Sequence, residues 1–426
     1  MQHSSTLVDD VTSQRKSGQR FVAFEIEHEG HYAGYILNLA RYWAENELAG
    51  NLDFVVTQRF VDLHTDVVSE VNGLHESGVR IVGMTSTETS ELEAKGRLRY
   101  FKAWQLYCKY TQMLHADHGL IMYFDFFQLP SILGKSPCPF SCIYFRPTFH
   151  YRDFSNYVGT MSERFKAFRK KTVLQRVLAK KELRNLFCLD PFAAEYIHKH
   201  MTTDARIVYL PDPVKVYTDS GTRSAELRRS IGVPSDRTVF LLLGVLDRRK
   251  GVTQLLDAID QLPTDVASQC SFVLAGPVEA AQRDIVTATV DRLNAKPNVS
   301  VILRDEFIQD RDVQEHYGMA DIVLATYQKH MGMSSALVRS AAAGKPVLAS
   351  NYGLTSELTQ RRNLGVTVES TDPSEIARSI ISIAGCDPNT LFDANEAERF
   401  ALENSAENTA KTLFDALFQT VAVQQQ

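Results

Sequence analysis

The sequence predicts an α/β protein built from two doubly wound, parallel-sheet domains. From Val239 to Ser350 one pattern repeats, in which a short apolar run, a turn with Gly or Pro and a helix-length segment follow one another. Apolar runs at 52–56, 79–84 and 119–124 show similar spacing in the first half. Strands that alternate with helices form βαβ units and hence parallel sheets. A length of 426 residues suits two domains of ~100 to 200 residues each.

The composition is that of a globular protein without a strong charge bias. The chain is 44% hydrophobic and 23% charged with a net charge of −5, which indicates no nucleic-acid partner. Six cysteines, at 108, 138, 142, 188, 270 and 386, lack Cys-x-x-Cys spacing, so we expect reduced core thiols. We find neither a signal peptide nor a run of the ~18 apolar residues that span a membrane. A cytoplasmic protein with a disordered lead-in over residues 1–19 is therefore expected.

The densest cluster of signals is the stretch 320–353, ADIVLATYQKHMGMSSALVRSAAAGKPVLASNYG. An apolar strand at 322–325 leads into a loop with Gly332, Ser334 and Ser335, and a helix of small residues then runs to Gly344. Free amides at the start of a helix attract anions, so this loop predicts a phosphate site. Taken alone, the pattern fits an ordinary strand-to-helix turn equally well.

A second turn upstream favours the phosphate site. In FLLLGVLDRRKGVTQLLDAI a strand at 240–243 ends at Gly244, and Lys250 precedes a helix. Ligands of open α/β sheets bind at the carboxyl ends of the strands. One cationic turn and one turn with free amides therefore predict a clamp for a diphosphate.

With these two turns the chain resembles the nucleotide-sugar glycosyltransferases of the two-domain GT-B fold, in particular the retaining family 4. The matching segments are GVLDRRKG, FVLAGP, EHYGMADIVLATY and GKPVLASNYGLTSEL. The resemblance implies two Rossmann-like domains that face each other across a cleft. It places an acceptor-binding domain at 20–213, a linker with a short helix at 214–235 and a nucleotide-sugar-binding domain at 236–395. Residues 396–426 are expected as a C-terminal helix that crosses back to the first domain.

The implied activity is transfer of a sugar from a nucleotide-diphosphate sugar to a saccharide or lipid-linked acceptor, as in polysaccharide biosynthesis. Retention at the anomeric carbon is implied too, and the scheme requires no metal ion and no cofactor besides the co-substrate. Such a transfer needs positive charge at the leaving diphosphate, and Lys250 is the first choice for it. The candidate donor and phosphate residues are Gly244, Arg248, Lys250, Gly276, Phe307, His330, Gly332, Met333, Ser334, Ser335 and Arg339.

The sequence departs from the family at the donor loop. The family carries two glutamates eight positions apart, and counting from Gly344 places Met331 and Arg339 there. Val245 stands where an Arg is usual. Arg339 could restore positive charge at the diphosphate, but a guanidinium has no lone pair to accept the ribose hydroxyls. An alternative therefore stays open, namely a catalytically impaired glycosyltransferase-like protein that acts as a binding or regulatory partner.

The first half supplies acceptor and catalytic candidates at the ends of its predicted strands. A strand at 20–28 leads into Glu29, Gly30 and His31, which occupy the acceptor loop, although a His at a helix start is commonly a capping residue. Asp125 follows the run GLIMYF, with capping of the next helix as its other interpretation. Arg146 ends the strand 140–145 and His150 follows it. The catalytic candidates are Asp125, Arg146, His150 and Lys250.

Residues 164–184, RFKAFRKKTVLQRVLAKKELR, contain nine Lys or Arg and one acid. Phe165, Phe168, Leu174, Val177 and Leu178 are expected to form an apolar face. A solvated helix that covers the sheet is the commoner outcome for such a run of charges. The other interpretation is peripheral contact with an anionic membrane at the inner face, which would suit a lipid-linked acceptor.

Overall fold

The computed structural model describes residues 18–28, 32–94, 96–154, 157, 159–214 and 221–424, and divides the chain into two units. The first unit holds the chain up to His150, then Thr160–Pro213 and the residues from Ala406 onwards. The second holds Tyr151–Gly159 and Val214–Ser405. The chain therefore passes from one unit to the other four times. The first domain was expected to be continuous over 20–213, whereas the segment Tyr151–Gly159 belongs to the second unit. Residues 1–17 of the expected lead-in lie outside the described residues.

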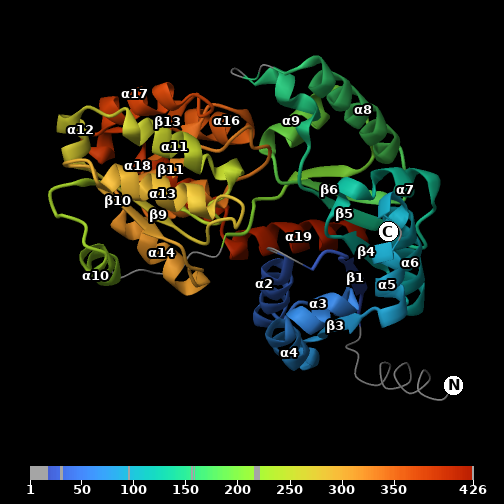
Figure 1. Ribbon diagram of the computed structural model, residues 1–426. Helices are drawn as coiled ribbons and strands as arrows, with labels where there is room; N and C mark the ends of the chain where they lie inside the picture. The colour runs from blue at the N-terminus through green and yellow to red at the C-terminus, as the bar shows by residue number, and fades with distance from the viewer. Residues whose placement is uncertain are drawn as a thin grey trace. The chain divides into compact units, whose positions relative to one another are not determined.

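The first unit contains a seven-stranded parallel sheet in the order β3-β2-β1-β4-β5-β6-β7 (Figure 1). Its strands coincide with the apolar runs of the sequence, because a parallel strand is buried on both faces. They are β1 (Arg20–Phe24), β2 (Asn51–Val56), β3 (Val79–Gly83), β4 (His118–Ile121), β5 (Phe140–Tyr144), β6 (Leu183–Cys188) and β7 (Arg206–Tyr209). The predicted first strand is four residues too long, since β1 ends at Phe24.

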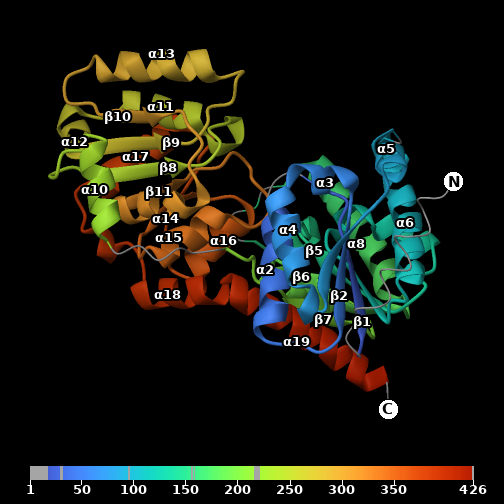
Figure 2. The same ribbon diagram turned by 90° about the horizontal axis from the view of Figure 1, so that it is seen from below.

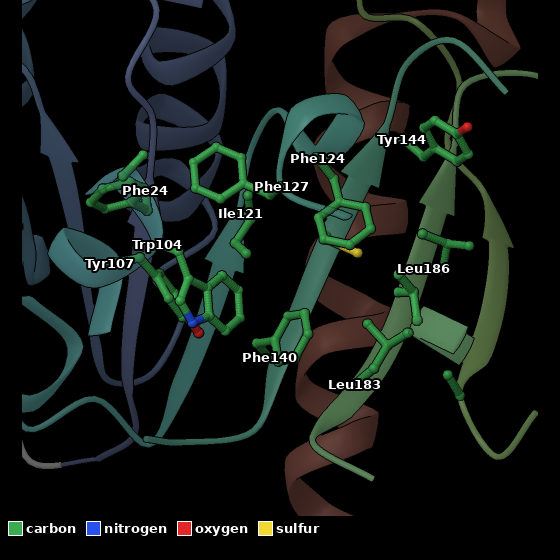
Figure 3. Close-up of a cluster of buried hydrophobic side chains, with 14 of the residues drawn as sticks. Phe24, Trp104, Tyr107, Ile121, Phe124, Phe127, Phe140, Tyr144, Leu183 and Leu186 are labelled. Atoms are coloured by element: carbon green, nitrogen blue, oxygen red, sulfur yellow. The ribbon is translucent and has the colours of Figure 1, made fainter. Parts of the chain in front are cut away.

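Helices cover both faces of this sheet. Side chains alternate along β1, so Val22 and Phe24 enter one core while Phe21 and Ala23 enter the other. Figure 3 shows the first core, where Phe24, Trp104 and Phe140 come together from β1, α6 and β5. The helices are α2 (Tyr32–Glu45), α3 (Gln58–Leu63), α4 (Thr65–Gly73), α5 (Ser86–Ala94), α6 (Arg99–Met113), α7 (Gln128–Leu133), α8 (Met161–Leu178), α9 (Pro191–His200) and α19 (Ala406–Gln424).

The second unit contains a six-stranded parallel sheet in the order β10-β9-β8-β11-β12-β13. Its strands are β8 (Thr238–Leu243), β9 (Cys270–Ala275), β10 (Val301–Arg304), β11 (Ile322–Ala325), β12 (Val347–Ser350) and β13 (Gly365–Val368). Its helices are α10 (Thr222–Ser230), α11 (Val252–Asp260), α12 (Thr264–Gln269), α13 (Arg283–Asn294), α14 (Asp310–Met319), α15 (Ser335–Ala342), α16 (Gly353–Arg361), α17 (Pro373–Ile383) and α18 (Ala394–Glu403). One core lies between the sheet and the helices α11, α13 and α17.

The C-terminal segment is two helices rather than the single helix expected from residue 396. Helix α18 ends at Glu403, because the carbonyl of Asn404 leaves the helical ladder and accepts the Val214 amide at 3.0 Å. Helix α18 remains in the second unit beside α15. Helix α19 returns to the first unit beside β6, as Figure 2 shows, and Phe414 packs on Trp43 with ring centroids 5.2 Å apart. The predicted return of the last helix to the first domain is confirmed.

Helix α8 separates two apolar sets that the sequence analysis assigned to one face. Leu174, Val177 and Leu178 are buried in the core, whereas Phe165 and Phe168 are each 68% exposed. Nine residues advance a helix by 2.5 turns, so Phe165 and Leu174 point to opposite sides. In the described part of the chain, no helix is long and apolar enough to cross a bilayer.

Candidate active site

The two turns predicted to bind phosphate follow β8 and β11, which are neighbours in the second sheet. The strand order of the sheet reverses between these two strands. Strands β8 and β11 are neighbours, with β9 and β10 on one side and β12 and β13 on the other. In an open α/β sheet this topological switch point is where ligands bind, outside the carboxyl ends of the strands. The turn after β8 carries Lys250 and the turn after β11 carries Tyr327.

Lys250 is buried, with 7% exposure, and points along the end of β8. Its Nζ donates to the Leu243 carbonyl at 2.6 Å and to the Tyr327 hydroxyl at 3.2 Å. The short helix Arg248–Lys250 is capped by Asp247, whose carboxylate accepts the Lys250 amide at 2.9 Å. An ammonium carries three N–H donors, and two are used here. Among the described residues no partner is found for the third, so Lys250 keeps one donor for a ligand.

Gly244 and Gly276 allow the turns after β8 and β9 to approach closely. Gly244 has φ +114°, and a Cβ there would lie 3.0 Å from the Lys250 Nζ. A Cβ at Gly276, where φ is +131°, would lie 2.2 Å from the Gly244 carbonyl oxygen. Gly276 therefore requires glycine on steric grounds, and the positive φ favours glycine at both positions.

Tyr327 links Lys250 to the loop before α15, and sequence reasoning missed it. The Ser334 hydroxyl donates to the Tyr327 hydroxyl at 3.1 Å, and the Lys250 Nζ lies 4.8 Å from the centre of the tyrosine ring. Burial raises the pKa of Tyr327, but Lys250, Ser334 and Arg249 outweigh that effect and leave the pKa below its usual value. An aromatic residue two positions after a strand, in a turn rich in polar residues, was the available signal.

The amides of the loop before α15 fall into two groups. The Gly332 amide donates to the Tyr151 hydroxyl at 3.2 Å. For the amides of Met333, Ser334 and Ser335, no acceptor is found among the described residues. These three amides stand at the start of α15, so they present partial positive charge.

The segment Tyr151–Gly159, here called the strap, packs on the loops that follow β11 and β12. Tyr151 is 1% exposed and contacts Gly353, where an added Cβ would lie 3.4 Å from the tyrosine ring. Tyr157 packs on Tyr352 with ring centroids 5.4 Å apart. No local sequence pattern pairs residue 151 with residue 332, which is why the strap was missed.

Other donor candidates lie at the edges of this cluster or away from it. Arg248 is exposed, and Phe307 is 72% exposed in the loop after β10. The His330 Nε2 lies 3.4 Å from the Met333 carbonyl oxygen. Burial raises the pKa of Tyr317 on α14, and the positive charge of Arg339 opposes that rise. The Arg339 guanidinium is therefore close enough to α14 to interact with Tyr317. The expected contact between Arg339 and a diphosphate remains a prediction.

The three catalytic candidates of the first unit are differently placed. Asp125 accepts the amides of Phe145 and Arg146 at 2.9 and 3.0 Å, which fastens the turn after β5 rather than capping a helix. Arg146 is exposed. His150 is 2% exposed, and its Nε2 lies 3.0 Å from Asp190, the N-cap of α9. The structure thus places His150 in the core, where it packs instead of facing solvent.

The switch point of the first sheet lies between β1 and β4, and its acceptor candidates Glu29, Gly30 and His31 lie outside the described residues. Immediately before them, Glu25 follows β1 with 2% exposure. Its Oε1 accepts the amides of Ile26 and Glu27 at 2.8 Å, which ends the strand. Burial raises the pKa of Glu25 to about 8.

Aromatic side chains surround this end of the first sheet. The rings of Tyr32 and Tyr123 meet edge to face at 5.7 Å, and those of Tyr100 and Phe126 stack at 4.5 Å. Sequence reasoning missed this group, although Glu25 is recognisable as a charged residue at the end of an apolar strand. Carboxylates beside aromatic rings are suited to polar ligands with apolar faces.

Comparison with known proteins agrees with this geometry. Residues 223–399 match the family model described as Glycosyl transferases group 1. Two D-inositol 3-phosphate glycosyltransferases are similar in sequence. That of Corynebacterium kroppenstedtii is 26% identical over 198 residues, which cover 45% of this chain and 43% of the relative. That of Streptomyces bingchenggensis is 24% identical over 237 residues, which cover 53% and 51%. The chain thus spans about half the length of the curated relatives that it matches.

Solved structures resemble the chain over nearly its whole length. Sucrose-phosphate synthase from Thermosynechococcus elongatus gives a TM-score of 0.67 at 16% identity and covers 95% of this chain and 100% of its own. HepE of Anabaena, in complex with UDP and glucose, gives 0.60 at 14% identity and covers 94% and 100%. The fold is therefore GT-B, and the predicted fold is confirmed. The match to the Glycosyl transferases group 1 model lies within the second unit.

Proposed function

We propose that the protein is a glycosyltransferase that moves a sugar from a nucleotide-diphosphate sugar to a hydroxylated acceptor. The observation that carries the proposal is the buried cluster of Lys250, Tyr327 and Ser334 at the switch point of the second sheet. The match of residues 223–399 to the glycosyltransferase family model supports it.

The second unit would bind the donor through its diphosphate. The remaining N–H donor of Lys250 and the amides of Met333, Ser334 and Ser335 form the positive side of this site. As the bond between sugar and phosphate breaks, negative charge grows on the leaving diphosphate, and fixed donors stabilise it without reorganisation. Tyr327 holds the Lys250 ammonium from one side, so the cation keeps one orientation.

The first unit would bind the acceptor at the end of its sheet, near Glu25, Tyr32 and Tyr123. With a pKa of about 8, Glu25 is largely protonated at neutral pH and can donate or accept a hydrogen bond. Aromatic faces beside such a group suit a saccharide or polyol acceptor. The names of the two similar D-inositol 3-phosphate glycosyltransferases, which refer to a phosphorylated polyol, agree with an acceptor of this class.

Retention at the anomeric carbon and activity without a metal ion are part of the proposal. An Asp-x-Asp triplet, a motif that metal-dependent transferases use, lies at 310–312, where α14 begins after β10. Strand β10 is two strands away from β8, so this triplet belongs to a different part of the sheet edge from Lys250. We therefore expect transfer to continue after treatment with EDTA.

The test is a thermal-shift panel of UDP, GDP, ADP, CDP and dTDP with the full chain. A ligand at 100 times its dissociation constant adds about 2.7 kcal/mol to the free energy of unfolding. One nucleotide should therefore raise the melting temperature clearly, and its sugar conjugates are then assayed for transfer, with and without EDTA. Flat curves across the panel would instead support the catalytically impaired binding partner.

A further inference from the structure

Helix α8 presents a stripe of large apolar side chains to solvent. Met161, Phe165 and Phe168 are 79%, 68% and 68% exposed. They occupy positions i, i+4 and i+7, so they lie on one side of the helix. Single exposed apolar residues are ordinary on a protein surface, but three in a row along one helix form a patch. We call these three residues the α8 stripe.

The surroundings of the α8 stripe are cationic. Helix α8 carries six Lys or Arg and one Glu, whereas the chain as a whole has a net charge of −5. Arg164, Lys166 and Arg169 are exposed beside the stripe. The Glu163 carboxylate accepts the Thr160 amide at 2.7 Å and the Thr160 hydroxyl at 3.0 Å, so it serves to cap the helix. The outer face of α8 is therefore apolar and positive.

The inner face of α8 fixes this orientation. Leu174 and Val177 are fully buried in the core of the first unit. The Lys170 Nζ donates to the Thr148 hydroxyl at 2.8 Å, and the Lys171 Nζ donates to the Tyr196 hydroxyl at 2.8 Å. These contacts all come from residues 170–177 and hold the second half of the helix against the first unit, so the α8 stripe points away from the sheet. Figure 1 shows α8 at the margin of its unit.

We propose that the α8 stripe docks on the surface of an anionic phospholipid bilayer. The phenyl rings would enter the boundary between headgroups and acyl chains, and the flanking cations would stay among the lipid phosphates. Charge complementarity selects an anionic surface, because the cations need negative partners beside an apolar layer. An anionic bilayer offers both negative phosphates and an apolar layer along a flat face. An acidic protein surface offers only the negative charge.

The experiment is sedimentation of the full chain with phospholipid vesicles, without donor or acceptor. Neutral phosphatidylcholine vesicles are compared with vesicles that contain roughly one third phosphatidylglycerol. We expect binding at least ~10-fold stronger on the anionic vesicles. We also expect release at high salt, where the screening length falls to ~3 Å at 1 M. Because no sugar nucleotide is present, this result is separate from the outcome of the nucleotide panel.

Two sets of variants assign the binding to α8. Phe165→Ser with Phe168→Ser removes the rings, and binding to anionic vesicles should fall at least ~10-fold. Arg164→Gln, Lys166→Gln and Arg169→Gln together should remove the preference for anionic lipid. All five residues are exposed, so the melting temperature should stay near that of the wild type.

Matched controls come from the second unit. Ile285→Ser removes an apolar side chain that is 64% exposed, and Arg378→Gln with Arg399→Gln removes two exposed cations. Both controls should bind vesicles like the wild type. The proposal is overturned if the wild type does not sediment with anionic vesicles, or if the α8 variants bind as well as the controls.

Discussion

Lys250 is buried, and contacts within the protein use two of the three N–H donors of its ammonium group. Two of its donors bind Leu243 and Tyr327, which hold the side chain, and the third is left for a phosphate oxygen. The flanking Arg248 and Arg249 are exposed and cannot replace it in the same place. In the proposed function, a single cation would therefore decide how well the site stabilises a leaving diphosphate.

The substitution Lys250→Met keeps the apolar stem of the side chain and removes the charge. We expect kcat/KM for the nucleotide sugar to fall by about 100-fold to 1000-fold, the range seen when one preorganised donor is lost. Steady-state kinetics measures this, and circular dichroism checks the fold. Lys296→Met, which removes a lysine paired with Asp260 on the surface of the same unit, is the control. Equal activity of the two variants would exclude Lys250 from the site.

Sequence patterns located Lys250, Gly244 and the serines of the loop, because each follows a strand at a regular distance. They did not reveal that Tyr327 joins Lys250 to Ser334, since a hydroxyl contact across two turns leaves no trace in spacing. They also made His150 and Asp125 catalytic candidates, because each follows a predicted strand. In the structure, His150 instead packs beside Asp190, and Asp125 accepts hydrogen bonds from the turn after β5. Both side chains are enclosed by residues remote in sequence.

Among the elements, the strap Tyr151–Gly159 is the one that most affects the candidate site. Its Tyr151 hydroxyl accepts the Gly332 amide, which is the kind of group that a phosphate oxygen would otherwise use. In the proposed site the strap would therefore compete with a ligand for this amide. We infer that the stability of the loop and the strength of nucleotide binding are coupled through this hydrogen bond.

The substitution Tyr151→Phe separates these two effects. We expect the free energy of unfolding to fall by about 1–3 kcal/mol, because the buried Gly332 amide loses its acceptor. The shift in melting temperature on adding the binding nucleotide should become larger, because that amide is then open to phosphate.

Phe154→Leu is the control for Tyr151→Phe, since it alters the ring packing on Tyr151 but keeps the hydroxyl. Thermal melts with and without nucleotide measure both quantities. A nucleotide shift in Tyr151→Phe that is smaller than in the wild type would contradict competition.

Elements with a strong apolar period were predictable, and elements fixed by distant contacts were not. The parallel strands followed from their apolar runs, and the return of α19 followed from the family resemblance. The break between α18 and α19 did not, because it depends on the bond between Val214 and Asn404, which are 190 positions apart in the numbering. The two faces of α8 could have been separated from the sequence by counting helical turns.

For the whole molecule, the first unit depends on the last helix of the chain. Leu413, Phe414 and Leu417 of α19 are buried against the same core as Phe21 and Trp43. Tyr42 stacks on Phe414 as well, with ring centroids 6.0 Å apart. This core is therefore built from the two ends of the chain, and the second unit lies between them in sequence.

The substitution Phe414→Ala tests how much the first unit relies on α19. We expect a loss of about 3–5 kcal/mol in the free energy of unfolding, as for other large aromatic side chains removed from a core. Urea unfolding followed by the fluorescence of Trp43 and Trp104, which both lie in the first unit, measures it. Lys411→Ala, on the exposed side of the same helix, should change the stability by no more than ~0.5 kcal/mol. A similar small change for Phe414→Ala would show that α19 is dispensable.

The position of α19 also sets the order of events during synthesis on the ribosome. The sheet of the first unit emerges early, but one of its two cores stays open until α19 has left the exit tunnel. The second unit is complete before that moment, because its last residue is Ser405. We therefore expect the second unit to fold before this core of the first unit closes, so that Trp43 and its neighbours stay accessible to chaperones that shield apolar surfaces.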